Sequence, residues 1–540
     1  MKHRLNPRCI FALLLMGLCC LLLLAACNRD TADSDLDEPE MPESLTQQPE
    51  PRYALPDAAP PFPARWAVRH VLAEPINPYT TDNPDNRAVA GLVYEPLFRL
   101  DAAFDAVPVL AESISTADGV TYIITLRDDV IFHNDAALTA QDVLYSLRQA
   151  RANPYYSGRL DIIYRYSRRT DEEGAYLPHE FELTLRRVHG NLPALLTFPI
   201  IQSGTVGWTV PPGTGEFFYD EGNVPRRLTA FAGHWASPGL PTDTIYLRES
   251  ATTERMVADF NAGYLSMLNI DPTVIGAYRF GEARHVQTYA TTVLEYIGFN
   301  INRPHTSQAN FRQAVHFALD RAHIAARIMG GNAVPTNLLF HPASAVFDAE
   351  LAEQFACDLS RAETFLRGNG AVLELEYEVE SAYDAPPAGA KFELNLLFSA
   401  DNPRNREIAV FLSERLAEIG ITLTLDERPF EEYAAALQAG DFDLYLGAVR
   451  LQADFDLTAL LVGELAFGGA GRLVERRLIE HFLSAGMADR AEAARLLSVA
   501  ALGTMPITPI AYREMTVITR RDLGMRLAPV QEQVFLFNLD

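Results

Sequence analysis

Cysteine is almost absent from this chain of 540 residues. The sequence contains five cysteines, and only Cys357 lies beyond residue 27. A disulfide within the main body of the protein is therefore excluded, so its stability must come from a packed core. A chain of this length can bury a large core and is long enough for two or three domains.

The chain also lacks the short motifs that identify many enzymes. It has no Gly-x-x-x-x-Gly-Lys-Ser/Thr loop for ATP and no Gly-x-Ser-x-Gly segment for a serine nucleophile. His179-Glu180 is not followed by a second histidine at metalloprotease spacing. His316 and His323 could share one helix face, but such pairs are more often structural than metal-binding. We therefore predict a binding protein rather than an enzyme, without a cofactor.

Positive charge is scarce. The chain has 45 lysines and arginines against 70 aspartates and glutamates, a formal net charge of −25. This balance argues against nucleic acid and anionic lipid as partners. It does not indicate a cationic ligand, because acidic charge spread over a surface mainly serves solubility.

Only one hydrophobic run is long enough to span a membrane. Residues 9–26 are almost wholly apolar and follow the basic residues Lys2, Arg4 and Arg8, a pattern typical of an export signal. The run ends in Leu24-Ala25-Ala26-Cys27, which resembles the lipobox of bacterial lipoproteins. That resemblance implies cleavage before Cys27 and lipid attachment to it, which would change the net charge from −25 to −28 because three basic residues and no acid are removed. The alternative is an uncleaved membrane anchor; in both cases the rest of the chain works outside the cytoplasm.

The segment after the signal has the composition of a disordered chain. Residues 28–63 are rich in Asp, Glu, Pro, Ser and Gln and have hardly an aromatic residue. Such a segment cannot bury enough apolar surface to offset the entropy lost on ordering. We predict a tether that holds a folded body, beginning near residue 64, at some distance from the membrane.

The folded body alternates strand and helix patterns. In the first half, residues 121–126 alternate as a half-buried strand, and Thr139 with Asp142 forms a capping box that opens a helix. The second half is plainer, with glycines that end both helices. Its expected elements are a strand at 392–398, a helix at 404–419, a strand at 421–425, a helix at 430–439 and a strand at 442–449. This order predicts an α/β fold with a parallel or mixed sheet covered by helices.

Several segments together resemble the family 5 extracellular solute-binding proteins, the peptide, dipeptide and nickel receptors of ABC importers. The similarity is nearly position by position between Val109 and Leu147. Further matching segments are Leu92-Val-Tyr-Glu-Pro-Leu97, Gly213-Thr-Gly215, Phe299-Asn300, residues 311–321 and Met505-Pro506. The resemblance extends from about residue 65 to the C-terminus.

The resemblance implies a two-lobed periplasmic-binding-protein-like fold of class II, with an extra subdomain in the first lobe. The expected layout is a signal peptide at 1–27, a tether at 28–63, a first lobe at 64–300 with the subdomain at about 95–205, a second lobe at 301–507 and a return to the first lobe at 508–540. Ligand in the cleft would contact both lobes only when they are closed, so binding would favour closure.

The function that the resemblance implies is capture of a short peptide by lobe closure and its delivery to the permease subunits of an ABC importer. We expect a lipid-anchored monomer in the periplasm or on the outer surface of the cytoplasmic membrane. The alternatives are a nickel or metal-chelate receptor of the same family and a ligand sensor or chaperone outside transport.

One aspartate is the main candidate ligand residue. In peptide receptors of the family, an aspartate in an Ala-Asp-Tyr-like motif pairs with the amino terminus of the peptide, and Asp454 stands in that place. A carboxylate in a closing cleft is costly unless it meets a cation, which makes it suited to an α-ammonium. As a cleft residue it should contribute little to folding. The chain departs from the motif in having Leu451 where the family often has tryptophan, and a loop-capping role is the alternative.

Five further residues are candidates for ligand contact. Asp82 stands where an acid lines the cleft of oligopeptide receptors, although an exposed turn residue is the alternative. Tyr155 and Tyr156 resemble a loop whose tyrosine contacts the peptide backbone, with core packing as the alternative. Arg450, beside Asp454, could hold a ligand carboxylate. Tyr512 is a weaker candidate.

Overall fold

The computed structural model describes residues 66–71, 74–220, 226–236, 239–250, 252–272, 280–281, 284–368, 392–523 and 527–537. The predicted export signal, Cys27 and the predicted tether lie outside the described residues. Among the helices of the described chain, none is long and apolar enough to cross a membrane.

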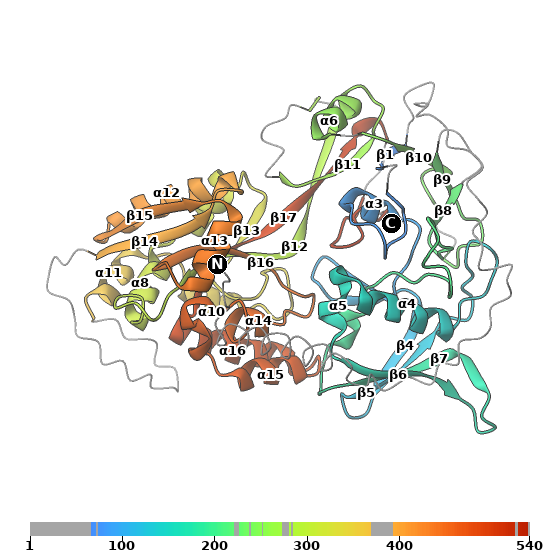
Figure 1. The fold of residues 1–540 in the computed structure, drawn as a ribbon, viewed down its shortest axis with the longest axis horizontal. Coiled ribbons are helices and arrows are strands. Elements are labelled where there is room, and N and C mark those ends of the chain that lie inside the picture. Colours follow the sequence, from blue (N-terminus) through green and yellow to red (C-terminus); the bar gives the residue numbers. More distant parts are fainter. Residues whose placement is uncertain are drawn as a thin grey trace, which may run out of the picture.

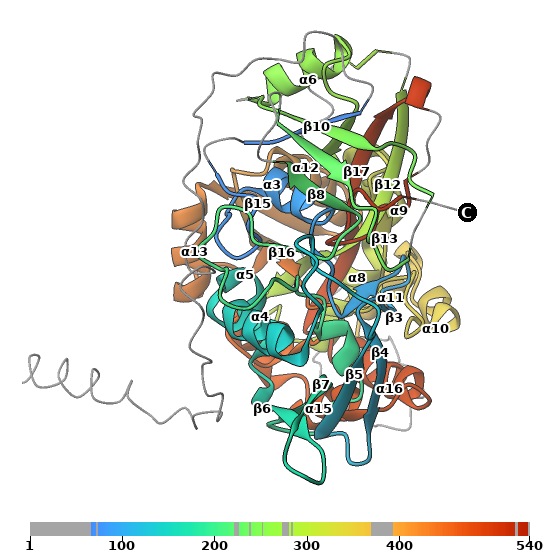
Figure 2. The same ribbon diagram turned by 90° about the vertical axis from the view of Figure 1, so that its right-hand side faces the viewer.

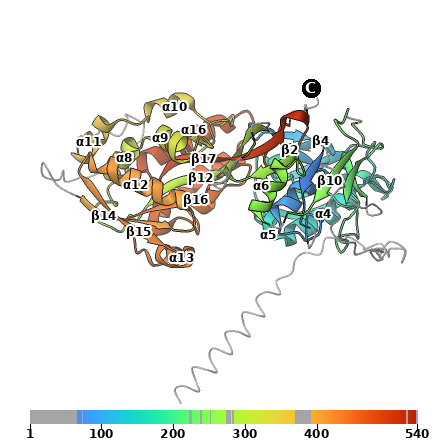
Figure 3. The same ribbon diagram turned by 90° about the horizontal axis from the view of Figure 1, so that it is seen from above.

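Two lobes lie side by side and are joined by two long antiparallel strands, β12 (Arg284–Phe299) and β17 (Ile507–Arg520) (Figure 1). Seen from above, the same two strands bridge the gap between the lobes (Figure 3). They belong to one continuous sheet with the strand order β15-β14-β16-β12-β17-β11-β1-β10-β9-β8, with β13 paired to β17. The sheet therefore passes through both lobes.

The first lobe contains one end of this sheet and a separate four-stranded sheet, β4-β5-β7-β6. The separate sheet and helix α4 lie at the end of the lobe opposite α6 and β10, as Figures 1 and 2 agree. The strands are β1 (Ala67–Arg69), β2 (Phe98–Leu100), β3 (Ala106–Pro108), β4 (Ala111–Thr116), β5 (Thr121–Leu126), β6 (Ile163–Thr170), β7 (Tyr176–Leu185), β8 (Phe217–Asp220), β9 (Arg227–Ala230), β10 (Thr244–Arg248) and β11 (Met267–Ile270). The helices are α3 (Pro84–Ala90), α4 (Ala140–Ala152), α5 (Pro154–Leu160), η1 (Leu192–Leu195) and α6 (Thr253–Asn261).

The second lobe is a parallel arrangement covered by helices. Its strands are β13 (Ala333–Pro335), β14 (Phe392–Ser399), β15 (Ile421–Arg428) and β16 (Leu444–Arg450). Its helical segments are α8 (Ala309–Ala318), α9 (Arg321–His323), η2 (Ile324–Ile328), α10 (Ala349–Gln354), α11 (Leu359–Leu366), α12 (Pro403–Ala417), α13 (Phe430–Ala439), α14 (Thr458–Leu461), η3 (Phe467–Arg472), α15 (Arg476–Ser484) and α16 (Arg490–Thr504). A short turn, η4 (Arg521–Leu523), follows β17.

The strand and helix pattern predicted from the sequence is confirmed in this lobe. Strand β14 pairs in parallel with both β15 and β16, as strand–helix–strand order requires. Helix α13 has the predicted bounds and ends at Gly440, whose φ of 69° is accessible to glycine at little cost. Strand β16 begins at Leu444, two residues later than expected.

The passage between lobes falls at an irregularity of β12. Up to Ala290, β12 pairs with β17, whose other edge pairs with β11 of the first lobe. From Val293 onward β12 also pairs with β16 of the second lobe. Between Ala290 and Leu294 the register with β17 shifts, and such bulges bend and twist a strand. The domain boundaries near 300 and 508 stay predictions; the change of strand partners lies a few residues from each.

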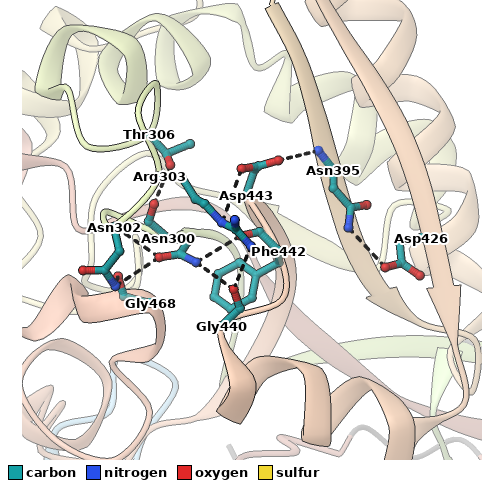
Figure 4. A network of polar contacts seen from close by, with 10 residues as sticks. All are labelled: Asn300, Asn302, Arg303, Thr306, Asn395, Asp426, Gly440, Phe442, Asp443 and Gly468. Atoms are coloured by element: carbon teal, nitrogen blue, oxygen red, sulfur yellow. Dashed lines mark hydrogen bonds and ion pairs between the residues drawn. The ribbon is translucent and has the colours of Figure 1, made fainter.

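Beyond the bulge, the end of β12 is fixed to the second lobe by a polar network around Asn300 (Figure 4). Its side-chain amide donates to the carbonyl oxygens of Gly440 and Phe442 at 3.0 and 3.1 Å. Its own carbonyl oxygen accepts a hydrogen bond from the Thr306 hydroxyl, and Arg303 adds a further bond to Gly440. This end of β12 therefore belongs to the second lobe, and the irregular pairing with β17 lies between it and the first lobe.

Candidate functional site

Two neighbouring cavities lie on either side of helix α5, where the lobes meet. We name the first, of about 200 Å³, the hinge cavity, because the strands that join the lobes line part of it. Among the described residues, its lining from the second lobe consists of Arg450 alone. We name the second, of about 310 Å³, the lobe-contact cavity; His189 and Asp454 face it from opposite lobes.

Helix α5 presents the predicted tyrosines to the hinge cavity. Asn153 caps the helix, since its side-chain oxygen accepts a hydrogen bond from the Tyr155 N–H at 2.8 Å, and Pro154 occupies the first helical position. The Asn153 amide also donates to the carbonyl oxygen of Tyr79, which fixes the start of the helix against the first lobe. Tyr155 is 39% exposed and Tyr156 only 3%, so the first offers a contact surface and the second mainly supports it.

The two tyrosine rings are held by arginines. The Arg87 guanidinium lies 4.1 Å from the centre of the Tyr155 ring, and that of Arg159 lies 5.1 Å from the Tyr156 ring. The rings meet edge to face with centroids 4.9 Å apart. Burial raises the pKa of both hydroxyls, so both tyrosines are neutral near pH 7. They can therefore offer a ligand flat apolar area and a neutral hydroxyl.

Positive charge dominates the lining of the hinge cavity. Its charged side chains are Arg87, Arg99, Arg450 and Glu532. Glu532 is already neutralised, because it forms an ion pair with Arg159 at 2.7 Å and accepts a hydrogen bond from a threonine hydroxyl at 2.8 Å. The guanidinium groups of Arg99 and Arg450 make no hydrogen bond or ion pair within the described chain. Arg87 donates to a backbone carbonyl, but its Nε is buried and has no partner among the described residues.

Asp454 faces the lobe-contact cavity and not the hinge cavity. Its Oδ2 lies 2.9 Å from Nε2 of His189, and its Oδ1 accepts the N–H of Asp456 at 3.1 Å. Arg490 donates to its backbone carbonyl. Burial alone would raise the pKa of this carboxyl, but the hydrogen bond and charge of His189, together with Arg490, hold the pKa below its usual value.

This placement corrects one expectation about Asp454. The side chain is 2% exposed and both of its oxygens are engaged, so the premise that it is an accessible cleft residue is wrong, and its contribution to folding stays a prediction. The error arose because its partner is 265 positions away in the sequence. Its pairing with a ligand ammonium stays a prediction, and it would compete with His189.

Three of the remaining candidates lie together and two lie elsewhere. The hinge cavity is lined by Tyr155, Tyr156 and Arg450. Asp82 is exposed and lines neither cavity. Tyr512 is fully buried, and its hydroxyl donates to the carbonyl oxygen of Leu339 at 2.5 Å, so it is packed in the core.

The two helix histidines do not share a site. His316 is fully buried with Nδ1 3.0 Å from an Arg321 nitrogen, whereas His323 stacks on Phe411. Within the described ranges, no group of three or more His, Cys, Asp or Glu side chains is arranged to hold a metal ion.

The lobes also touch through an aromatic contact. Phe104 of the first lobe packs against Phe455 and His341 of the second, with ring centroids 5.5 and 4.9 Å apart. Both phenylalanines are buried and have positive φ angles, 64° and 57°, which are costly for such residues. Nearby, the N–H of Gly190 donates to the carbonyl oxygen of Leu483. In this structure the lobes are therefore joined at the lobe-contact cavity.

Sequence reasoning missed His189, Arg159, Glu532, Arg99 and Arg87. Arg159 and Glu532 are 373 positions apart, and no motif surrounds either one. Only an excess of arginines near the matched segments could have hinted at them, and such residues are usually solvated surface cations.

Known proteins resemble the chain over much of its length. The model of the bacterial extracellular solute-binding proteins, family 5, matches residues 105–459. The glutathione-binding protein GsiB of Shigella flexneri serotype 5b (strain 8401) is 24% identical over 361 residues, and the oligopeptide-binding protein AppA of Bacillus subtilis (strain 168) is 25% identical over 362. Each match covers 64% of this chain; it spans 66% of the glutathione-binding protein and 65% of the oligopeptide-binding protein.

The fold is also that of solved structures. The nickel ABC transporter protein of Bacillus halodurans superposes with a TM-score of 0.67 at 18% identity, covering 85% of this chain and 95% of that one. The predicted fold, a two-lobed α/β periplasmic-binding-protein-like architecture, is confirmed. With the family match over more than half of its residues, the chain belongs to the family 5 bacterial extracellular solute-binding proteins.

Proposed function

We propose that the protein captures short peptides in the hinge cavity by lobe closure and delivers them to the permease subunits of an ABC importer, and that it is not an enzyme. One observation carries this proposal: Tyr155 and Tyr156 of the first lobe, Arg450 of the second and the strands that join the lobes all line the same cavity. A solute that touches all three parts favours the closed arrangement, because those contacts exist together only there.

The chemistry of the lining suits a peptide. Tyrosines supply flat area that tolerates different side chains, and an arginine suits a carboxylate. The relatives named for glutathione and oligopeptides support this solute class. A bare nickel ion has less support, since the described residues include no cluster of three or more His, Cys, Asp or Glu side chains that could hold it; a metal chelate stays the alternative.

Small molecules retained by the gently purified protein test this function directly. Denaturation of the protein should release bound peptides, which mass spectrometry identifies. Calorimetry should then show saturable binding of the same peptides to the unmodified protein. Tyr164→Ala, a change of an exposed first-lobe tyrosine outside both cavities, should leave binding unaffected, whereas Tyr155→Ala should weaken it. Retention of metal chelates without peptides would contradict the proposal.

We also propose that Cys27 carries a lipid anchor. Cys27→Ser should leave uncleaved precursor and abolish fatty-acid labelling, as checked by gel shift and metabolic labelling. Normal processing and labelling of this variant would refute the anchor without bearing on solute capture.

A further inference from the structure

The charge of the hinge cavity is opposite to that of the protein. The chain has a net charge of −25, yet three arginines and one carboxylate line this cavity, and the carboxylate of Glu532 is committed to Arg159. Arg99 and Arg450 have no hydrogen-bonding or ion-pair partner in the described chain, and the buried Nε of Arg87 has none. Arg450 is exposed and Arg99 is half-buried, so both guanidinium groups are open to a ligand that brings anionic oxygens.

The carboxylate that would attract an ammonium is not free. His189 of the first lobe lies 2.9 Å from Asp454 of the second, and both side chains are almost completely buried. The imidazole thus occupies the position that a ligand amino group would take on this carboxylate. This pair faces the lobe-contact cavity; the charged residues that line the hinge cavity within the described chain are three arginines and Glu532, which is paired with Arg159.

We propose, on the basis of the function proposed above, that the solute is a short peptide held by its carboxylate on Arg450, and that a free α-ammonium is not needed for binding. His189 acts as the specificity-determining residue, since it already binds the carboxylate of Asp454, to which the family resemblance assigns the amino terminus of a peptide. The preferred solutes are therefore peptides with net negative charge, including peptides whose amino terminus is blocked.

The position of Arg450 links this preference to closure. It is the last residue of β16 and supplies the whole second-lobe share of the described lining. A carboxylate bound to it while the peptide lies on Tyr155 necessarily bridges the two lobes. Charge-assisted bonds of this kind are about twice as strong as neutral ones, so the anionic group should dominate the stabilisation of the closed form.

A tripeptide library in three forms tests the proposal. The free, N-acetylated and C-amidated libraries are offered to the purified full-length protein, and bound peptides are counted by mass spectrometry. The N-acetylated form should bind at least as well as the free form, and the C-amidated form at least about tenfold less. In Arg450→Gln the advantage of a free carboxylate should disappear, and Arg450→Lys should restore part of it. Arg477→Gln, an exposed arginine on α15 that lines neither cavity, should behave as the unmodified protein.

The outcomes separate this inference from the function on which it rests. Binding of no tripeptide in any form would overturn the proposed function. Peptide binding in which the amidated form matches the free form would overturn the role of Arg450. Peptide binding in which N-acetylation weakens capture more than tenfold would show that the amino-terminal subsite is open, and would overturn the role of His189.

Discussion

The hinge cavity and the lobe-contact cavity share helix α5 but treat charge in different ways. In the hinge cavity, the arginines at positions 99 and 450 have no hydrogen-bonding or ion-pair partner within the described chain. In the lobe-contact cavity, His189 and Asp454 are hydrogen-bonded to each other at 2.9 Å across the two lobes. Removing one partner of a buried pair is costly, whereas the exposed Arg450 is open to a partner from outside. The comparison distinguishes the proposed binding site from a contact between the lobes, although the family resemblance alone had pointed to a residue of that contact, Asp454.

Removing the acid of this contact should have the largest effect. Asp454→Ala leaves the buried His189 without its hydrogen-bond partner and removes a carboxylate near the buried Arg490, so the free energy of unfolding should fall by about 3–5 kcal/mol. Urea unfolding followed by circular dichroism measures this loss. Asp456→Ala is the control, because it removes a long ion pair, at 3.7 Å, and one hydrogen bond from the Thr458 N–H, and it should cost about 1 kcal/mol. Equal stability of both variants would mean that the contact of Asp454 with His189 contributes no more to the fold than these more exposed interactions.

Acid should weaken the fold before it breaks the contact between His189 and Asp454. Burial, with repulsion from neighbouring cations at two of the sites, lowers the pKa of His70, His133 and His341 to about 4. Their folded pKa lies below the unfolded value, so the stability that they contribute is complete above about pH 6.5 and is lost as the pH falls toward 4. Each contributes up to about 3 kcal/mol. The lowered pKa of Asp454 acts in the same direction but only below its ordinary value of 3.8.

Urea midpoints between pH 7 and 4 check this order. Asp454→Asn should lower the urea midpoint by the same amount at every pH in that range. His133→Gln should instead make the urea midpoint depend less steeply on pH. A steep loss of stability that disappears in Asp454→Asn would show that the contact of Asp454 with His189, and not the other buried histidines, titrates there.

Removal of the Tyr155 ring, which lines the hinge cavity, should reduce peptide affinity more than it reduces stability. Tyr155→Ala removes a ring that is 39% exposed and stacked under Arg87, so peptide affinity should fall by about 1–2 kcal/mol and the free energy of unfolding by less than about 1 kcal/mol. Calorimetry and urea unfolding of the same variant give both numbers. The opposite pattern, a large loss of stability with unchanged affinity, would assign Tyr155 to the core.

The rim of the lobe-contact cavity should matter least. Arg187 lies 3.7 Å from Asp456 and its side chain is 42% exposed, so Arg187→Gln should change the free energy of unfolding by less than about 0.5 kcal/mol. Urea unfolding at low and at high salt measures it. A loss as large as that of Asp454→Ala would contradict the expectation that the partly exposed Arg187–Asp456 pair contributes little to the free energy of unfolding.

The sequence was sufficient where short-range rules decide the structure. Helix α13 was predicted from Phe430 to Ala439 because apolar spacing and the glycine at 440 are local signals. Tyr155 was predicted because its segment resembles the family, and Arg450 because it lies beside Asp454; both line the hinge cavity. The partners of the site were out of reach, since Glu532 meets Arg159, and His189 meets Asp454, only after the chain has folded. A family motif pointed to Asp454, but it could not show that His189 of the first lobe forms a hydrogen bond with this carboxylate.

Because the sheet is continuous, the first lobe, which is synthesised first, is the last to complete its strand pairing. Strand β11 has β1 on one side and β17 on the other, and its partners in β17 lie about 250 residues further along the chain. The parallel strands of the second lobe can assemble as soon as β16 has emerged, whereas the gap between β11 and β12 stays open until residues 507–520 arrive. Strand β17 thus completes the sheet, because it pairs with β11 on one side and β12 on the other. During synthesis the first lobe has to wait with unpaired strand edges, which makes it the part most dependent on protection from aggregation.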